Sequence, residues 1–157
     1  MSTVSGYRSN ILIRGAEVGD NAPNGSRASV DRDLSRSWPG GSGAGEVDVV
    51  YDTEGTATDT PTVIDLSELP SMVGEADRDC GRLMAVEIEN TGAAVLLVGG
   101  GTTPAFAQLT IPAGGRISMS FAASAADGID VSTNKNISIE CATSTTYRLS
   151  IAGRTVA

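Results

Sequence analysis

The chain has 157 residues, a length typical of one domain or of one domain with an extension. Hydrophobic residues make up 40% of it but aromatic residues only 4%, so a core must be built mainly from Val, Ile, Leu, Met and Ala. The net charge is −8 and the sequence has no cluster of basic residues that could bind phosphate groups. We therefore expect no nucleic-acid partner.

Residues 1–44 are predicted to form an extended, irregular N-terminal arm. Their one apolar run is Ile11-Leu12-Ile13, and stretches rich in Gly, Pro and Asn follow it. This composition favours turns and irregular chain, and it is too poor in apolar residues for a core. Ordering such an arm costs about 1–2 kcal/mol per residue, so we expect it to become ordered on a partner. The expected partner-binding residues are Ile11, Leu12, Ile13 and Trp38.

The next part of the chain is acidic, because residues 37–80 hold one Arg against ten acids. We interpret this charge as solvated loops, with attraction of a cation or a basic partner as the alternative. Two carboxylate pairs could share a cation, namely Asp48 with Asp52 and Asp77 with Asp79. No EF-hand spacing is present, so we expect no metal and no other cofactor.

Two strands are predicted in this region, at residues 47–51 and 62–66, and both are expected to pair with strands nearer the C-terminus. The best helical candidate, residues 66–73, is interrupted by Pro70. The compact domain is expected to span residues 45–157.

The C-terminal half alternates apolar and polar residues with a period of two. This pattern is typical of half-buried antiparallel strands, and a continuously apolar run fits a strand covered on both faces. Short strands at such regular spacing predict an all-β antiparallel β-sandwich, jelly-roll-like. The seven predicted strands lie at residues 83–90, 94–98, 106–111, 116–121, 129–132, 137–141 and 147–151.

Turn residues separate these strands. Asn90-Thr91-Gly92 leaves a gap of hairpin length between the first two. In Pro112-Ala113-Gly114-Gly115, proline supplies a fixed φ and glycine a positive one, which suits a tight turn. Gly99-Gly100-Gly101 lacks the lysine and helix of a phosphate-binding loop, so we interpret it as a loop of the sandwich.

The residue types needed for catalysis are scarce, so we predict that the protein is not an enzyme. The chain has no histidine, the commonest general base and metal ligand. Its two cysteines, Cys80 and Cys141, are far apart and are expected to be free thiols, with Cys141 a small core residue. Lys135, the only lysine, is expected at a solvated turn.

The first residues lack the charged and apolar regions of a signal peptide, and the longest apolar run, residues 93–98, is far too short to span a bilayer. We therefore expect a protein made in a cytoplasm, with no membrane partner.

Three stretches carry a resemblance to a known group of proteins. They are residues 86–92, which end in Asn-Thr-Gly, residues 95–99, and residues 109–115, which contain Pro-Ala-Gly. This succession resembles small β-sandwich virion proteins of tailed bacteriophages, including capsid decoration (cement) proteins. The resemblance covers residues 83–151 and implies a virion component without catalytic residues.

We therefore expect a structural virion protein on the capsid surface of a bacteriophage, made in the host cytoplasm. Its expected function is to bind and stabilise the head shell as a decoration protein, with the major capsid protein and its own copies, as a homotrimer, for partners. One alternative is a head–tail joining or tail-surface virion protein. A further alternative is a host-surface or carbohydrate-binding module, which the shortage of aromatic residues disfavours.

Overall fold

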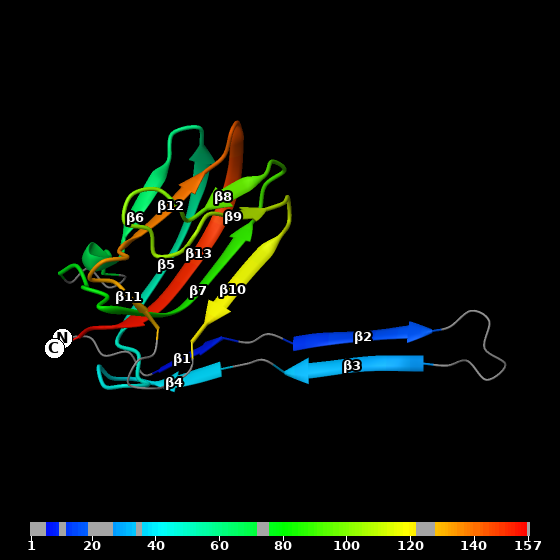
Figure 1. Ribbon diagram of the computed structural model, residues 1–157, viewed down its shortest axis with the longest axis horizontal. Coiled ribbons are helices and arrows are strands. Elements are labelled where there is room, and N and C mark those ends of the chain that lie inside the picture. Colours follow the sequence, from blue (N-terminus) through cyan, green and yellow to red (C-terminus); the bar gives the residue numbers. More distant parts are fainter. Residues whose placement is uncertain are drawn as a thin grey trace. The chain divides into compact units, whose positions relative to one another are not determined.

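The computed structural model describes the chain at residues 6–9, 12–18, 27–33, 36–71, 76–121 and 128–156 (Figure 1), and side chains within these ranges from residue 37 on. The chain divides into two units, one within Arg8–Ser37 and the other containing Trp38 and the described residues after it. The division lies before Trp38, and not at the predicted boundary after residue 44, because Trp38 is part of the core of the larger unit.

The described part of the predicted arm contains paired strands, so the expectation of an irregular chain there is wrong. Strand β2 (Leu12–Val18) pairs antiparallel with β3 (Arg27–Asp33), with Leu12 opposite Asp33 and Val18 opposite Arg27. Strand β1 (Gly6–Ser9) and β4 (Arg36–Pro39) form a second two-stranded sheet.

A five-stranded antiparallel sheet forms one layer of the larger unit. Its order is β10-β7-β13-β5, and the short β11 pairs with β7 beyond the end of β10. The bounds are β5 Val49–Thr58, β7 Arg82–Asn90, β10 Arg116–Ser120, β11 Ile129–Asp130 and β13 Ser144–Arg154.

A four-stranded antiparallel sheet of order β6-β12-β8-β9 forms the other layer. The bounds are β6 Thr62–Asp65, β8 Leu96–Val98, β9 Leu109–Ile111 and β12 Asn136–Glu140. One 3-10 turn, η1 (Leu66–Glu68), follows β6 where the helical candidate was predicted. All nine predicted strands are confirmed, and the two early ones do pair with later strands, β5 with β13 and β6 with β12.

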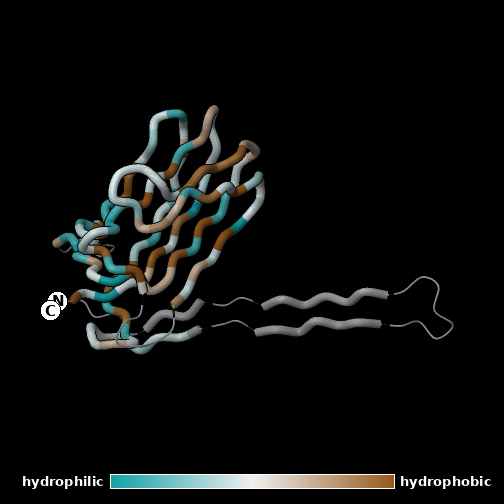
Figure 2. Tube along the Cα trace, in the orientation of Figure 1, coloured by the Kyte–Doolittle hydropathy of each residue, from teal (hydrophilic) through white to brown (hydrophobic). Residues whose placement is uncertain are grey.

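The core lies between the two sheets and is aliphatic, as the composition predicts. Hydropathy alternates along the strands (Figure 2), so one side of each strand faces the other sheet. The buried residues include Val86, Ile88, Leu149 and Ile151 from the five-stranded sheet and Leu96, Val98, Ile137 and Ile139 from the four-stranded sheet. Both cysteines are free and buried, which confirms Cys141 as a core residue. The all-β antiparallel sandwich is therefore confirmed.

The predicted hairpin at Asn90-Thr91-Gly92 is wrong, because β7 and β8 belong to different sheets. Asn90 is fully buried where the chain crosses between the layers. Its side-chain amide donates to the carbonyl oxygens of Ala94, Ile111 and Pro112 at 2.7, 3.1 and 3.1 Å. Its Oδ1 accepts from the Thr145 hydroxyl at 2.8 Å and from the Gly92 N–H at 3.2 Å. One side chain thus joins the crossing from β7 to β8 with the crossing from β9 to β10.

The turn between β9 and β10 forms as predicted. Gly114 has a φ of 67°, a left-handed value that favours glycine, and the Gly115 N–H donates to the Pro112 carbonyl at 2.9 Å.

Candidate functional site

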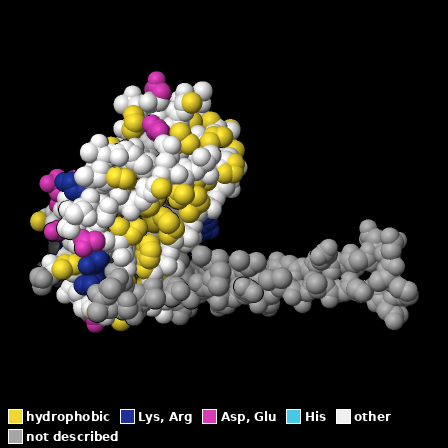
Figure 3. All heavy atoms as spheres, viewed as in Figure 1, with side chains coloured by type: hydrophobic (Ala, Val, Ile, Leu, Met, Phe, Trp, Pro, Cys, Tyr) yellow, Lys and Arg dark blue, Asp and Glu magenta, His cyan; other side chains and the backbone are white. Residues whose placement is uncertain are grey.

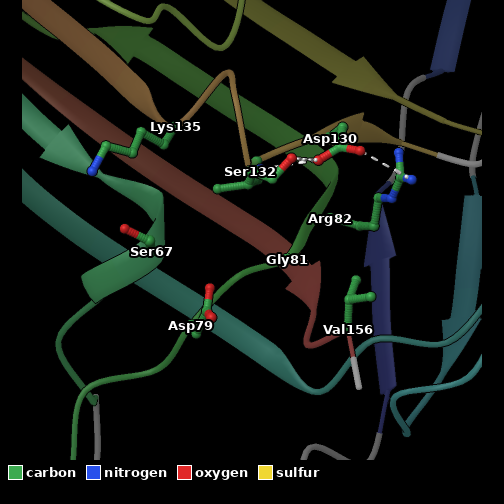
Figure 4. A pocket seen from close by; sticks show the side chains of 9 residues that line it. Ser67, Asp79, Gly81, Arg82, Asp130, Ser132, Lys135 and Val156 are labelled. Atoms are coloured by element: carbon green, nitrogen blue, oxygen red, sulfur yellow. Dashed lines mark hydrogen bonds and ion pairs between the residues drawn. The ribbon is translucent and has the colours of Figure 1, made fainter.

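A hollow of about 500 Å³ opens at the end of the sandwich where η1, β7 and β11 meet (Figure 4). Six of its nine lining residues are polar or charged. The lining residues are Ser67, Asp79, Gly81, Arg82, Asp130, Val131, Ser132, Lys135 and Val156.

The pairing of β11 with β7 builds one side of the hollow. Asp130 lies opposite Arg82 in the ladder, and the two side chains form an ion pair with 3.2 Å between Asp130 Oδ2 and Arg82 Nη2. Asp130 Oδ1 also accepts from the hydroxyl and the backbone N–H of Ser132, at 2.6 and 3.0 Å. These two hydrogen bonds, together with the charge of Arg82, hold the pKa of Asp130 below its ordinary value.

The start of η1 builds the other side. Asp65 caps this turn and accepts from the Ser67 N–H at 2.9 Å and from the Ser67 hydroxyl at 2.6 Å. Lys135 Nζ lies 3.3 Å from Asp65 Oδ2. Burial raises the pKa of Asp65, but the hydrogen bonds from Ser67 and the neighbouring Lys135 outweigh it and lower the pKa. Lys135 therefore forms an ion pair at the turn, and its side chain, 43% exposed, stays partly in contact with solvent as predicted.

Most of the polar groups at the hollow contact one another. Ser67 and Ser132 each donate a hydroxyl to a carboxylate of lowered pKa, and such a carboxylate is a poorer general base. Arg82 and Lys135 are each already paired with an acid. No aromatic residue lines the hollow, although aromatic platforms are what a sugar ring would need.

The predicted partner-binding residues fall in two different units of the chain, with Leu12 and Ile13 in one and Trp38 in the other. Ile11 lies outside the described residues, whereas Leu12 and Ile13 begin β2, opposite Asp33 and Arg32. Trp38 is only 3% exposed. It packs within its own chain in a second buried cluster with Val47, Met84, Ala85 and Ala152. This burial runs against the expectation that Trp38 packs on a partner, and it anchors β4 to the sandwich.

Two of the acids suspected of binding a cation, Asp48 and Asp52, have other contacts. Asp48 accepts from the backbone N–H and the hydroxyl of Thr155 at 2.7 and 2.6 Å, and Asp52 accepts from the Ser150 hydroxyl. Within the described residues, no three His, Cys, Asp or Glu side chains gather in a group that could hold a metal ion.

Sequence reasoning missed a row of alternating charge on the outer face of the five-stranded sheet. The ladders place Arg116 of β10 opposite Glu89 of β7, Glu89 opposite Arg148 of β13, and Arg148 opposite Glu54 of β5. We call these four residues the charged row. Arg148 Nε lies 2.6 Å from Glu54 Oε1, and Arg116 pairs with Glu87 of the next row. Arg116, Glu89 and Arg148 occupy polar positions of alternating runs, but the strand order that aligns them with Glu54 cannot be inferred from any single run.

Comparison of the chain with protein-family models, with curated proteins and with solved structures found no match. In the part of the chain that the structure describes, no helix has the length and apolarity to cross a membrane.

Proposed function

We propose that the protein is a non-enzymatic structural component of a bacteriophage virion, a decoration (cement) protein that binds the major capsid protein and stabilises the head shell. The resemblance of residues 83–151 to virion sandwiches motivates this proposal, and the confirmed sandwich fold is compatible with it. We propose a homotrimer as its assembled form.

The observation that supports it most is the separate unit within Arg8–Ser37. Its ladder of β2 and β3 has only two strands. An isolated two-stranded hairpin is marginally stable at best in water, since it buries too little apolar surface. A chain that contains such a hairpin in addition to a complete sandwich fits a protein whose hairpin binds along another surface. A capsid shell offers an extended surface of this kind.

The sandwich would then provide the globular body on the shell. Its outer polar face carries the charged row and a second row of Ser118, Glu87, Ser150 and Asp52. At the hollow near Asp130, Arg82 and Lys135 each form an ion pair with an acid.

Copy number tests the proposal. Particles produced by the genome that encodes the chain would be purified, and the ratio of this protein to the major capsid protein would be measured by quantitative mass spectrometry. Hundreds of copies per particle support shell decoration. A dozen or fewer favour a head–tail joining or tail-surface protein, and absence from the particle refutes the proposal.

A further inference from the structure

The five-stranded sheet has two unequal edges that complement each other. Strand β5 forms one edge and β10 the other, on opposite sides of the sheet (Figure 1). Strand β5 is ten residues long and contains neither proline nor lysine, and its ladder with β13 has no bulge. Natural proteins usually protect long edges with such features, because an unprotected edge pairs with other chains. No described strand pairs with the outer side of either β5 or β10.

The hydrogen bonds show which backbone groups face outward at each edge. In an antiparallel ladder, the N–H and C=O of one residue point toward the same neighbouring strand. The Phe121 N–H donates to Met84 O and the Asn90 N–H donates to Gly115 O, so the odd-numbered residues here face β7. The outward groups of β10 therefore belong to Arg116, Ser118 and Ser120.

The hydrogen bonds of β13 show which groups of β5 face outward. The Thr91 N–H donates to Thr146 O, so even-numbered residues of β13 face β7 and odd-numbered ones face β5. Because Leu149 of β13 lies opposite Thr53, the odd-numbered residues of β5 use their groups on β13. Val50, Asp52, Glu54 and Thr56 consequently direct their N–H and C=O groups outward.

The two edges also carry opposite charges at matching positions. The charged row begins at Arg116 on β10 and ends at Glu54 on β5, and both side chains are largely exposed, at 55% and 65%. Opposite charges that face each other across two strands stabilise their pairing, whereas like charges destabilise it. Two β5 strands centred on Thr53 would instead place Asp52 of one copy opposite Glu54 of the other.

We propose that β5 of one copy pairs antiparallel with β10 of a second copy, with Glu54 opposite Arg116 and Asp52 opposite Ser118. The outer faces then continue from copy to copy, and so does the alternation of the charged row. On the inner face, Tyr51 and Thr53 meet Met119 and Ile117. Tyr51, Met119 and Ile117 are only partly buried in one chain, and hydrophobic side chains gather over β7 and β10 on this side (Figure 3).

This contact is heterologous, because it joins two different edges. Neighbouring strands in the sheet are antiparallel throughout, so β5 and β10 run in opposite directions and every added copy keeps the orientation of the first. Such contacts close into rings or extend into open chains. The inference rests on the self-association in the proposed function and names its contact, and it can be tested without a shell.

Cysteine cross-linking of the full-length chain tests the pairing. One preparation carries Glu54→Cys and the other Arg116→Cys, and the two are mixed, oxidised and analysed by intact mass spectrometry. Directly opposite residues have Cβ atoms about 4.5–5.5 Å apart, within reach of a disulfide after a small adjustment. Both native cysteines are buried, which keeps background cross-linking low.

We expect heterodimers in the mixture and none in either preparation alone. Thr56→Cys is the matched control, because it is exposed on the same face but diagonal to Arg116, about 7–8 Å away. A second pair, Asp52→Cys with Ser118→Cys, checks the same register. Circular dichroism verifies that every variant is folded.

Three results would overturn the inference. Homodimers of Glu54→Cys alone would show that two β5 strands pair with each other. Equal linking of Thr56→Cys would refute the register. A lack of linked species with both folded pairs would show that these edges do not meet. None of these results depends on binding to a shell, so failure here is distinct from failure of the proposed function.

Discussion

Replacing Asn90 by alanine tests whether this one side chain holds the two layers together. Two of its hydrogen bonds are buried, the one to the Ile111 carbonyl and the one from the Thr145 hydroxyl. A buried polar group left without a partner costs about 1–3 kcal/mol, so two such groups cost about 2–6 kcal/mol. We expect a loss near the middle of this range, about 4 kcal/mol, out of a total stability of about 5–15 kcal/mol for a typical domain.

Urea unfolding measures this loss. Trp38 is the only tryptophan and is buried against the five-stranded sheet, so its fluorescence reports on the sandwich. With an m-value of about 2 kcal/mol/M, a loss of about 4 kcal/mol lowers the midpoint by about 2 M.

The matched control for Asn90→Ala is Asn136→Ala. The Asn136 amide donates to the Thr102 carbonyl at 2.9 Å and to the Thr103 hydroxyl at 3.0 Å, but these contacts are exposed and water can replace the amide. We expect it to cost about 1 kcal/mol, or about 0.5 M in the midpoint. If the two variants shift the midpoint equally, burial of the Asn90 hydrogen bonds does not increase their contribution to the free energy of unfolding, and the prediction is wrong.

Three further predictions concern pH, the arm and metals. Burial, followed by the charges of Asp79 and Asp48, raises the pKa of Cys80 to about 12. The folded state therefore keeps this proton above the unfolded pKa of about 9, and stability falls by about 1.4 kcal/mol per pH unit as pH rises from 9 toward 12. Urea unfolding at pH 8 and 10.5 should show a loss that is about 2 kcal/mol larger than in Cys80→Ala, and equal losses would contradict this. Changing Ile11-Leu12-Ile13 to serines should weaken assembly by several kcal/mol, at about 1.5–3 kcal/mol per buried side chain, while thermal melting of the sandwich stays the same. If the serine variant instead melts at a much lower temperature while it still assembles, the three apolar residues belong to the core of the sandwich and do not bind a partner. Thermal melts with and without EDTA should coincide, and a large fall with EDTA would revive a cation site at the acids Asp48, Asp52, Asp77 and Asp79.

The strands of the sandwich were predictable because their signal is local. Most have a short period-two run with turn residues beside it, as in Ile137 to Cys141, where burial of the alternate residues confirms the pattern. The strand order was not predictable in the same way. Asn90-Thr91-Gly92 has a composition suited to a hairpin, but its connection is decided by acceptors more than 20 residues away, at Ile111 and Pro112.

The site residues were harder to predict because their environment depends on distant parts of the chain. Trp38 lies among Gly, Pro and Ser and has no local pattern, yet it is buried against Met84 and Ala152. Lys135 lies in a turn between two asparagines, but the pairing of β12 with β6 brings it to Asp65. The partners in both cases follow from strand order, which no local window contains.

The order in which the strands are made has a consequence for synthesis of the protein on the ribosome. Strand β13 lies between β5 and β7, and β12 lies between β6 and β8, yet each is made after both of its neighbours. Until β12 and β13 leave the exit tunnel, β5 and β7 lack the strand that lies between them, and so do β6 and β8. Neither sheet can be completed before β12 and β13 are made, so we expect the sandwich to fold cooperatively once both have emerged. A ribosome that stalls before Ser144 would release a chain with the edges of β5 and β7 unpaired, and such edges promote aggregation.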